Sequence, residues 1–276
     1  MSISAQDVNK LRTMTGAGMM DCKKALTEAN GDFEEAITIL RKKGQKVSAN
    51  RADRTTTEGA VHIHLNSDAT EGVVIALGCE TDFVGKNEDF LNLGRELLAL
   101  AVAQKPADKD ALHALTIKNL SVADYITEYV GKIGEKIEVT NYEVLKAEKV
   151  ISYLHSNNKV GVLVGFSGVG SNDITEVGKD VAMQIAAMKP VALDKEGVDA
   201  SILEREIEIG KEQARQEGKP EAMLEKIAMG KLNKFYEDFT LLNQKFVKDN
   251  GVTIRQLLEN TQKGLTSTGF FRISIG

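Results

Sequence analysis

A thiol beside two lysines is the first group of side chains that could support chemistry. Cys22 is followed by Lys23 and Lys24, and neighbouring cations lower the pKa of a thiol and favour the nucleophilic thiolate. Cys22 could instead be a small apolar residue inside a helical bundle, which is the interpretation that we favour. A thiol enzyme would lose its activity in the variant Cys22→Ala, and we expect no such loss.

Two other motifs could bind a metal ion or a phosphate group. His62 and His64 share one face of an expected strand, but no Cys or acid nearby completes a ligand set, which favours a surface pair over a metal site. Gly168-x-Gly170 is only a fragment of a dinucleotide-binding fingerprint, and the sequence has no P-loop motif. The sequence therefore predicts no catalytic residues, no metal site and no cofactor.

The segment Thr81–Val84 could bind another protein. It places Phe83 beside the carboxylate of Asp82 where a strand is expected to end, and a rigid aromatic anchor often carries much of the energy of an interface. Phe83 could instead fold inward as a lid on its own sheet, and the residue types alone slightly favour that alternative. Met19 and Met20 could likewise meet a partner helix or pack in a core.

Composition excludes several classes of protein. Of the 276 residues, 42% are hydrophobic and 27% are charged, which is typical of a globular chain. The net charge of -5 disfavours a nucleic-acid surface, and the apolar runs are far shorter than the ~20 residues that span a bilayer. Two distant cysteines and the lack of a signal or transit peptide predict a cytoplasmic protein.

The N-terminal part of the chain predicts three short helices. Capping residues at Ser4 and Asp32 begin the first and the third helix, and Gly44 is expected to end the third. The second helix is expected over Met19–Ala29. Such a bundle, with the general shape of a ubiquitin-associated (UBA-like) domain, has little core of its own.

A basic segment follows at residues 41–54, where Asp53 is the only acid. The segment could be an anion-binding strip. A solvated helix end followed by a flexible linker is the simpler interpretation. We therefore place the first domain boundary here, so that the three-helix module and its linker occupy residues 1–54.

The next part of the chain predicts two copies of a β-hairpin followed by a helix. Residues 60–78 and 144–166 each predict two strands around a polar turn, and the helix after each hairpin ends in Lys-Pro. The first copy is longer between its second strand and its helix, where Cys79–Asn87 lies; this extra length is a functional loop or a harmless insertion. We expect an α+β core with subdomains at 55–142 and 143–276.

A protruding antiparallel helical hairpin is expected at about 199–236. Its two helices flank the sequence Gly218-Lys219-Pro220, and proline just after a glycine is a strong turn signature. The outer faces are charged, so the hairpin could project as an arm. Other elements are expected as a helical region at 108–131, a strand at 136–142, a helix at 254–260 and a strand at 269–275.

Several motifs of the chain resemble those of bacterial translation elongation factor Ts. Leu11–Leu26 is similar to the N-terminal signature of that family, and Cys79–Lys86, which reads CETDFVGK, is similar to its second signature. The resemblance extends from about residue 8 to residue 275, and both signatures stand in the family's order. Further motifs in that order are KIGE at 132–135, SYLH at 152–155, VGVLV at 160–164 and AMQIAAMKP at 182–190.

The resemblance implies a guanine-nucleotide exchange factor for elongation factor Tu, the GTPase that delivers aminoacyl-tRNA to the ribosome. It implies no covalent chemistry and no binding of nucleotide, nucleic acid or membrane by the chain itself. The Thr81–Val84 loop would dislodge Mg²⁺ from the GTPase, so that GDP leaves and GTP rebinds. Phe83 would insert between helices of the GTPase, while Asp82 would hold the loop or contact the partner. Other implied contacts are Met19, Met20, Lys23, Ile133, Gly134 and His155.

The helical arm matches the coiled-coil insertion of the family. The sequence departs from the family's pattern around the second signature, since Ala76 and Gly78 replace the usual Glu and Asn, and Gly85 replaces Ala or Ser. These departures imply a looser anchoring of the loop. A rival interpretation is an adaptor whose three-helix module binds ubiquitin-like or nascent-chain partners. Such an adaptor would not need a separate loop centred on Asp82 and Phe83.

Overall fold

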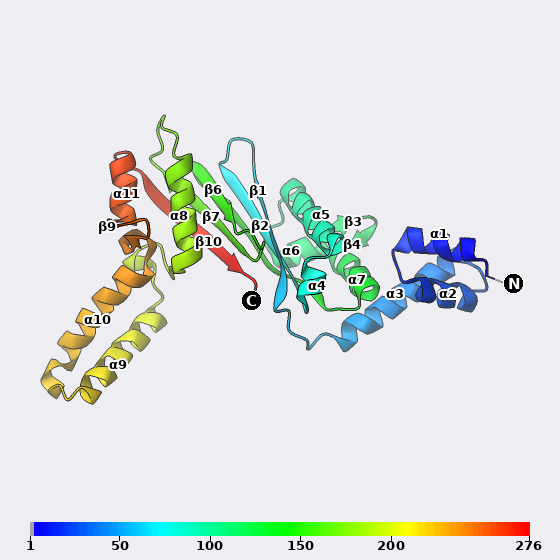
Figure 1. Ribbon diagram of the computed structural model, residues 1–276, viewed down its shortest axis with the longest axis horizontal. Helices are drawn as coiled ribbons and strands as arrows, with labels where there is room; N and C mark the ends of the chain where they lie inside the picture. Colours follow the sequence, from blue (N-terminus) through cyan, green and yellow to red (C-terminus); the bar gives the residue numbers. More distant parts are fainter. Residues whose placement is uncertain (1–2) are drawn as a thin grey trace.

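Three parts follow one another along the long axis of the molecule in the computed structural model, which describes residues 3–276 (Figure 1). Helices α1 to α3 lie at one end, two β-sheets with their covering helices form the middle, and the pair α9–α10 projects at the other end. This arrangement confirms the predicted α+β class with a helical module and a helical arm. Within residues 3–276, no helix is long and apolar enough to span a bilayer.

The N-terminal module consists of α1 (Ala5–Thr15), α2 (Met19–Glu28) and α3 (Phe33–Asn50). Its first helix begins as predicted, because the Ser4 side chain accepts a hydrogen bond from the Asp7 backbone and Asp7 accepts one from the Ser4 backbone. The core of the module is small, which is expected for a unit of this size. Its buried residues are Val8, Leu11, Cys22, Ala25, Leu26, Ala29 and Ala36.

The third helix is longer than predicted. We expected Gly44 to end it and residues 41–54 to be a solvated helix end followed by a flexible linker, but α3 continues to Asn50. Gly44 lies where α3 crosses α7 (Val122–Ile133), and a Cβ there would lie 3.2 Å from the carbonyl oxygen of Thr127. The expected helix end at Gly44 was therefore wrong, because this glycine permits a close helix crossing, and the segment that connects the helix to β1 begins only after Asn50.

The first sheet contains β1 (Glu58–Leu65), β2 (Glu71–Cys79) and β5 (Ile137–Lys146) in the antiparallel order β1-β2-β5. Helix α5 (Glu88–Gln104) packs on the sheet. The predicted first hairpin and its helix are confirmed. Strand β5 continues past residue 142, where we set the subdomain boundary, and the division into domains stays a prediction.

The second sheet contains β6 (Lys149–Leu154), β7 (Val160–Ser167) and β10 (Thr266–Ser274) in the antiparallel order β10-β7-β6. Helix α8 (Thr175–Met188) packs on it. In both sheets the second strand of the hairpin is therefore central and a later strand completes the sheet. This correspondence confirms the predicted duplication.

The two sheets pack against each other, with α5 and α8 on the outer faces (Figure 1). Glycine allows the close approach, since a Cβ on Gly161 would lie 2.5 Å from Cγ1 of Val61. Burial of the apolar side chains between the sheets favours the packed core over its exposed strands. The buried side chains of this interface are Val61, Val74, Ala76, Val150, Leu163, Ile273 and Ile275.

We expected the region at 108–131 to be helical throughout, and that expectation was wrong. A small hairpin interrupts it, because Lys118 and Asn119 adopt left-handed φ angles of 49° and 66° between two short strands. Ser121 caps the second helix, as predicted. The elements of this part and of the preceding connection are α4 (Asp82–Gly85), α6 (Lys109–Ala114), β3 (Thr116–Ile117), β4 (Leu120–Ser121) and α7.

The predicted helical hairpin is present as α9 (Ala200–Gln216) and α10 (Leu224–Phe239). Gly210 lets the two helices approach closely, since a Cβ there would lie 3.2 Å from Cα of Ala228. Pro220 precedes a 3-10 turn rather than occupying the first position of α10. The remaining elements are 3-10 turns at Lys195–Gly197, Glu221–Met223 and Leu241–Asn243, strands β8 (Lys245–Phe246) and β9 (Asp249–Thr253), and helix α11 (Ile254–Thr261).

Candidate partner-binding site

Phe83 lies on α4, a single helical turn between β2 and α5. Its side chain is 83% exposed, so the alternative in which it folds inward as a lid on the sheet is wrong. We expected this segment to be a loop, but residues Asp82–Gly85 form a helical turn. The extra residues of the first copy thus build a short helix that presents an aromatic side chain to solvent.

Local hydrogen bonds explain why this segment forms a helical turn. Thr81 caps it, because its Oγ1 accepts a hydrogen bond from the Val84 backbone at 3.4 Å. Asp82 pairs with Lys86 one turn later, with 2.7 Å between carboxylate oxygen and Nζ. The hydrogen bond from Lys86 lowers the pKa of Asp82. Val84 packs against the core of the first sheet, which anchors the turn that carries the exposed Phe83.

Two carboxylates that no sequence pattern singled out hold the start of the turn. Oε2 of Glu135 accepts hydrogen bonds from the backbone of Glu80 at 3.2 Å and of Thr81 at 3.0 Å. Oε1 of Glu135 accepts the Thr81 hydroxyl at 2.6 Å. Glu80 in turn accepts the Lys136 backbone at 2.7 Å and pairs with Arg51 at 2.6 Å. Glu135 belongs to the KIGE motif at 132–135, but that motif did not predict its contact with Glu80 and Thr81.

Glycines at the unusual signature positions permit close packing. A Cβ on Gly85 would lie 3.3 Å from the backbone nitrogen of Gly59 at the start of β1. A Cβ on Gly78 would lie 2.8 Å from Oγ1 of Thr56. Ala76 is fully buried between the two sheets. The three departures from the family's pattern therefore occupy crowded positions, where a larger side chain would require its surroundings to move.

The remaining core residues that we predicted to contact a partner lie near this turn. Ile133 and Gly134 end α7 immediately before Glu135, and Gly134 adopts the left-handed conformation at φ 84°. His155 is exposed in the turn between β6 and β7, where its Nδ1 lies 2.7 Å from the Tyr153 hydroxyl. That turn meets the start of β1, because the Val61 backbone donates to the Asn158 carbonyl oxygen at 2.7 Å.

The predicted contact residues of the N-terminal module form a separate surface. Met19 and Met20 are 52% and 64% exposed at the start of α2, so the alternative in which they pack in a core is wrong. Lys23 is exposed on the same helix, and Met14, which we did not predict, is exposed nearby on α1. Helix α3 separates this surface from α4 (Figure 1). The structure therefore does not bring the two groups together into one site.

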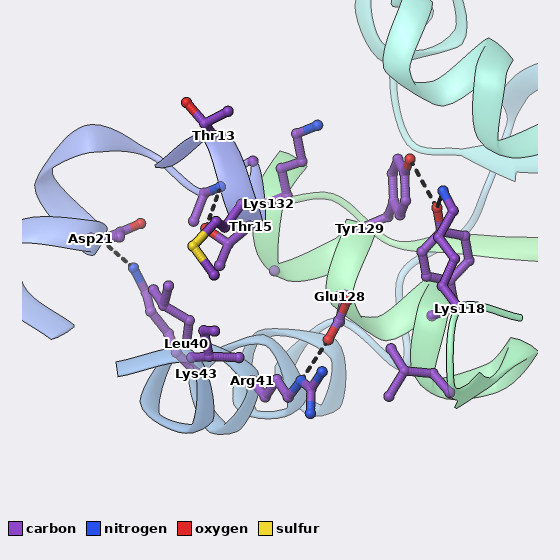
Figure 2. Close-up of a pocket in the computed structure, with 17 residues that line it drawn as sticks. Thr13, Thr15, Asp21, Leu40, Arg41, Lys43, Lys118, Glu128, Tyr129 and Lys132 are labelled. Atoms are coloured by element: carbon purple, nitrogen blue, oxygen red, sulfur yellow. Dashed lines mark hydrogen bonds and ion pairs between the residues drawn. The ribbon is translucent and has the colours of Figure 1, made fainter. Parts of the chain in front are cut away.

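A cavity of about 440 Å³ lies between the module and α7 (Figure 2). Four of the charged side chains that line it form two ion pairs. Arg41 lies 2.7 Å from Glu128 of α7, and Lys43 lies 2.5 Å from Asp21 within the module. These pairs join α3 to α7 and to α2, and they accompany the close helix crossing.

The groups that could have supported chemistry occupy structural positions. Cys22 is buried, and burial raises the pKa of its thiol, which disfavours the thiolate. We expected His62 to form a surface pair with His64, but His62 instead packs against Gly94. Burial there lowers the pKa of His62 to about 4. Among residues 3–276, no group of three or more His, Cys, Asp and Glu side chains could hold a metal ion.

The backbone amides of residues 168–170 are already occupied. They donate to the carboxylate of Glu148 at 2.8, 3.1 and 3.3 Å. Gly168 and Gly170 adopt positive φ angles of 72° and 58°, which aim successive amides at one point. The glycine fragment thus binds a carboxylate of its own chain.

An exposed phenylalanine on a turn tied by several hydrogen bonds is suited to entering a pocket on another protein. The chain thus has the features of a protein whose site is a docking surface for a macromolecular partner. Comparison with known proteins identifies the family within this class. A family model described as elongation factor TS matches residues 80–276.

Curated relatives extend the match to nearly the whole chain. Elongation factor Ts of Cytophaga hutchinsonii is 60% identical over 275 residues, which cover 99% of each chain. Elongation factor Ts of Amoebophilus asiaticus is 55% identical over the full length of both chains, and that of Flavobacterium psychrophilum is 50% identical over 275 residues, 100% of this chain and 99% of the relative. The chain belongs to the elongation factor Ts family, a family of exchange factors in translation elongation.

Proposed function

We propose that the chain binds the GDP-bound form of elongation factor Tu and inserts the Thr81–Val84 turn to dislodge Mg²⁺. The loss of Mg²⁺ speeds the release of GDP, and GTP then rebinds. The observation that carries this proposal is the position of Phe83, which is 83% exposed on a turn fixed by Thr81, Asp82 and Glu135. A rigid aromatic side chain loses little conformational entropy when it enters a partner's pocket.

The mechanism requires no covalent step by this chain. Mg²⁺ bridges the phosphate oxygens of the nucleotide to the GTPase, so a wedge that distorts its site weakens nucleotide binding. By linkage, nucleotide must weaken the binding of the exchange factor by the same factor. Binding of new GTP therefore expels the factor, which acts again, and the factor needs no nucleotide site of its own.

The remaining proposed contacts with the GTPase lie on two surfaces of the chain. Ile133, Gly134 and His155 would flank the inserted turn, because they lie at the end of α7 and in the neighbouring β6–β7 turn. Met19, Met20 and Lys23 would bind the same GTPase separately, and exposed thioethers adapt well to another protein's surface. We place the action in the cytoplasm, where translation elongation occurs.

The test is the rate at which labelled GDP leaves elongation factor Tu, with and without this protein, over a range of Mg²⁺ concentrations. We expect a large acceleration at millimolar Mg²⁺ and a smaller one when a chelator has already removed the ion. No acceleration at any Mg²⁺ concentration would contradict the exchange function. An acceleration of the same size with and without Mg²⁺ would contradict only the Mg²⁺ step.

A further inference from the structure

The start of the α4 turn is tied to the rest of the molecule by a reciprocal arrangement of two glutamates. Glu135 accepts three hydrogen bonds from Glu80 and Thr81, at 2.6 to 3.2 Å. Glu80 reaches back and accepts the backbone amide of Lys136, the residue after Glu135, at 2.7 Å. Each carboxylate thus satisfies backbone amides on the segment that carries the other. We call Arg51, Glu80 and Glu135 the carboxylate clasp.

Arg51 connects the clasp to the N-terminal module. It is the C-terminal cap residue of α3, and its guanidinium lies 2.6 Å from Oε1 of Glu80. The side chain of Glu80 is only 16% exposed, and ion pairs shielded from water are stronger than those on the open surface. Burial raises the pKa of Glu80, but the hydrogen bonds from Lys136 and Arg51 outweigh it and leave the pKa below its ordinary value. The carboxylate is therefore ionised at neutral pH.

The α4 turn needs such support because it is short. A helix of four residues cannot form by itself, since fixing the first turn costs more conformational entropy than its few hydrogen bonds return. The exposed Phe83 adds no burial to offset that cost. The clasp provides the fixed point from which Thr81 caps the turn, because the hydroxyl that accepts the Val84 amide also donates to Glu135.

We infer that Glu135 and Glu80 are positioning residues that hold the α4 turn in the conformation presenting Phe83, and that Arg51 links this conformation to the docked N-terminal helix α3. The inference rests on the proposed function for its consequence in nucleotide exchange. Its structural content is independent of any partner. The inference also gives α3 a role beyond connecting α1 and α2 to the core, because the helix contacts the core both at α7 and, through Arg51, at the clasp.

The structural part can be tested by amide hydrogen exchange of the free, full-length protein. We expect Glu135→Ala to increase exchange at Glu80, Thr81 and Val84, the amides that the clasp and the cap protect. Glu135→Gln should stay near the wild type, because its amide oxygen can still accept the two backbone N–H groups and its NH₂ can reach the Thr81 hydroxyl. Unchanged protection in Glu135→Ala would overturn the inference.

A matched control is Glu138→Ala, which removes a carboxylate of the same strand region. Glu138 accepts a hydrogen bond from the Thr56 hydroxyl at 2.7 Å and pairs with Lys136, and these polar partners lie outside the α4 turn. Exchange at Thr81 and Val84 should therefore stay unchanged in this variant. If Glu135→Ala does not fold, Thr81→Val replaces it, because that substitution removes only the hydroxyl that bonds Glu135 and caps the turn.

The functional part is tested by GDP release from elongation factor Tu. We expect Glu135→Ala to lower the maximal release rate by about tenfold, because misplacing a group by a small distance is costly. The concentration that gives half-maximal acceleration should change less. The double variant Phe83→Ala/Glu135→Ala should be no slower than Phe83→Ala alone, because Glu135 acts through Phe83. Further slowing in the double variant would contradict positioning.

The two arms distinguish failure of the inference from failure of the proposed function. If the wild type does not accelerate GDP release, the proposed function fails, and amide exchange still decides whether the clasp holds the turn. If the wild type accelerates release and Phe83→Ala does not, but Glu135→Ala equals the wild type, the proposed function stands and the positioning role is wrong.

Discussion

Gly44 of α3 and Gly131 of α7 meet where the two helices cross. A Cβ on Gly131 would lie 2.6 Å from Cα of Gly44, a separation that real Cβ atoms do not show. Because the obstructing atom belongs to the backbone, the helices would have to separate to admit a side chain. The position of the N-terminal module on the core therefore depends on two residues without side chains.

The variant Gly131→Ala should destabilise this crossing although alanine favours helix more than glycine does. We expect a loss of about 1–3 kcal/mol in the free energy of unfolding, which is typical of overpacking. The module should also move relative to the core. Urea unfolding measures the first effect, and a distance between spin labels on α2 and α5 measures the second.

Gly230→Ala provides the matched control for that experiment. Gly230 lies within α10, and a Cβ there has no heavy atom within 4 Å. Without a steric clash, helix propensity alone should raise the stability by up to about 1 kcal/mol. A gain of the same size in Gly131→Ala would show that the crossing tolerates a methyl group and would contradict the close contact.

This crossing also marks a limit of prediction from sequence. Glycine commonly ends a helix, and on that basis we predicted that the third helix ends at Gly44. The residue instead serves a contact with Gly131, which is 87 positions away in the printed sequence. By contrast, the helix starts at Ser4, Asp32 and Ser121 were predictable, because the capping side chain accepts a hydrogen bond from a backbone N–H only three residues further on.

His62 should make stability depend on pH in the acidic range. Burial, and to a lesser extent the charge of Arg95, lowers the pKa of His62 from its ordinary value of 6.5 to about 4 in the folded state. As pH falls through 6.5, the unfolded chain binds a proton at His62 and the folded chain does not. The contribution of His62 to the free energy of unfolding is therefore fully present above pH 6.5. It decreases as the pH falls to about 4, by up to about 3 kcal/mol in total.

The variant His62→Leu should lose this part of the pH dependence. Urea unfolding at pH 7.0, 5.5 and 4.5 measures it as the difference between the wild type and the variant. His64→Leu is the control, because His64 is exposed two residues further along the same strand. Parallel stability curves for the wild type and His62→Leu would contradict a buried, neutral His62.

Glu148 should stabilise the connection between β7 and α8. Removing its carboxylate in Glu148→Ala leaves the amides of residues 168–170 without their acceptor. We expect a loss of about 1 kcal/mol, less than is usual for hydrogen bonds to charged groups, because Glu148 is exposed to solvent. Thermal unfolding measures the loss, and Glu204→Ala on an exposed part of α9 should leave the melting temperature unchanged.

The features of the site that could not be predicted from the sequence mostly depend on contacts between residues that are far apart in the chain. The sequence predicted that Thr81–Val84 could bind a partner, but it left open whether the Phe83 side chain points into solvent or toward the sheet. The orientation depends on how α4 packs against β1 at Gly59 and Gly85. Glu135 was visible only as part of a motif. Its contact with Thr81 spans 54 positions and follows from the pairing of β2 with β5.

Met20 should contribute to partner binding but not to folding. Its side chain is 64% exposed, so Met20→Ala should change the free energy of unfolding by less than about 0.5 kcal/mol. Loss of an interface thioether should weaken binding of elongation factor Tu by about three- to tenfold. Isothermal titration calorimetry measures the affinity. Met223→Ala near the turn of the helical arm is the control, and an equal loss there would argue against a specific contact at Met20.

The most direct test of the central claim is the rate of GDP release from elongation factor Tu with saturating Phe83→Ala, compared with the wild type and with Phe239→Ala. Phe239 is a second exposed phenylalanine, 42% exposed at the end of α10. We predict that Phe83→Ala retains its fold and loses most of the acceleration, while Phe239→Ala accelerates release as the wild type does. Full acceleration by a folded Phe83→Ala would contradict the account.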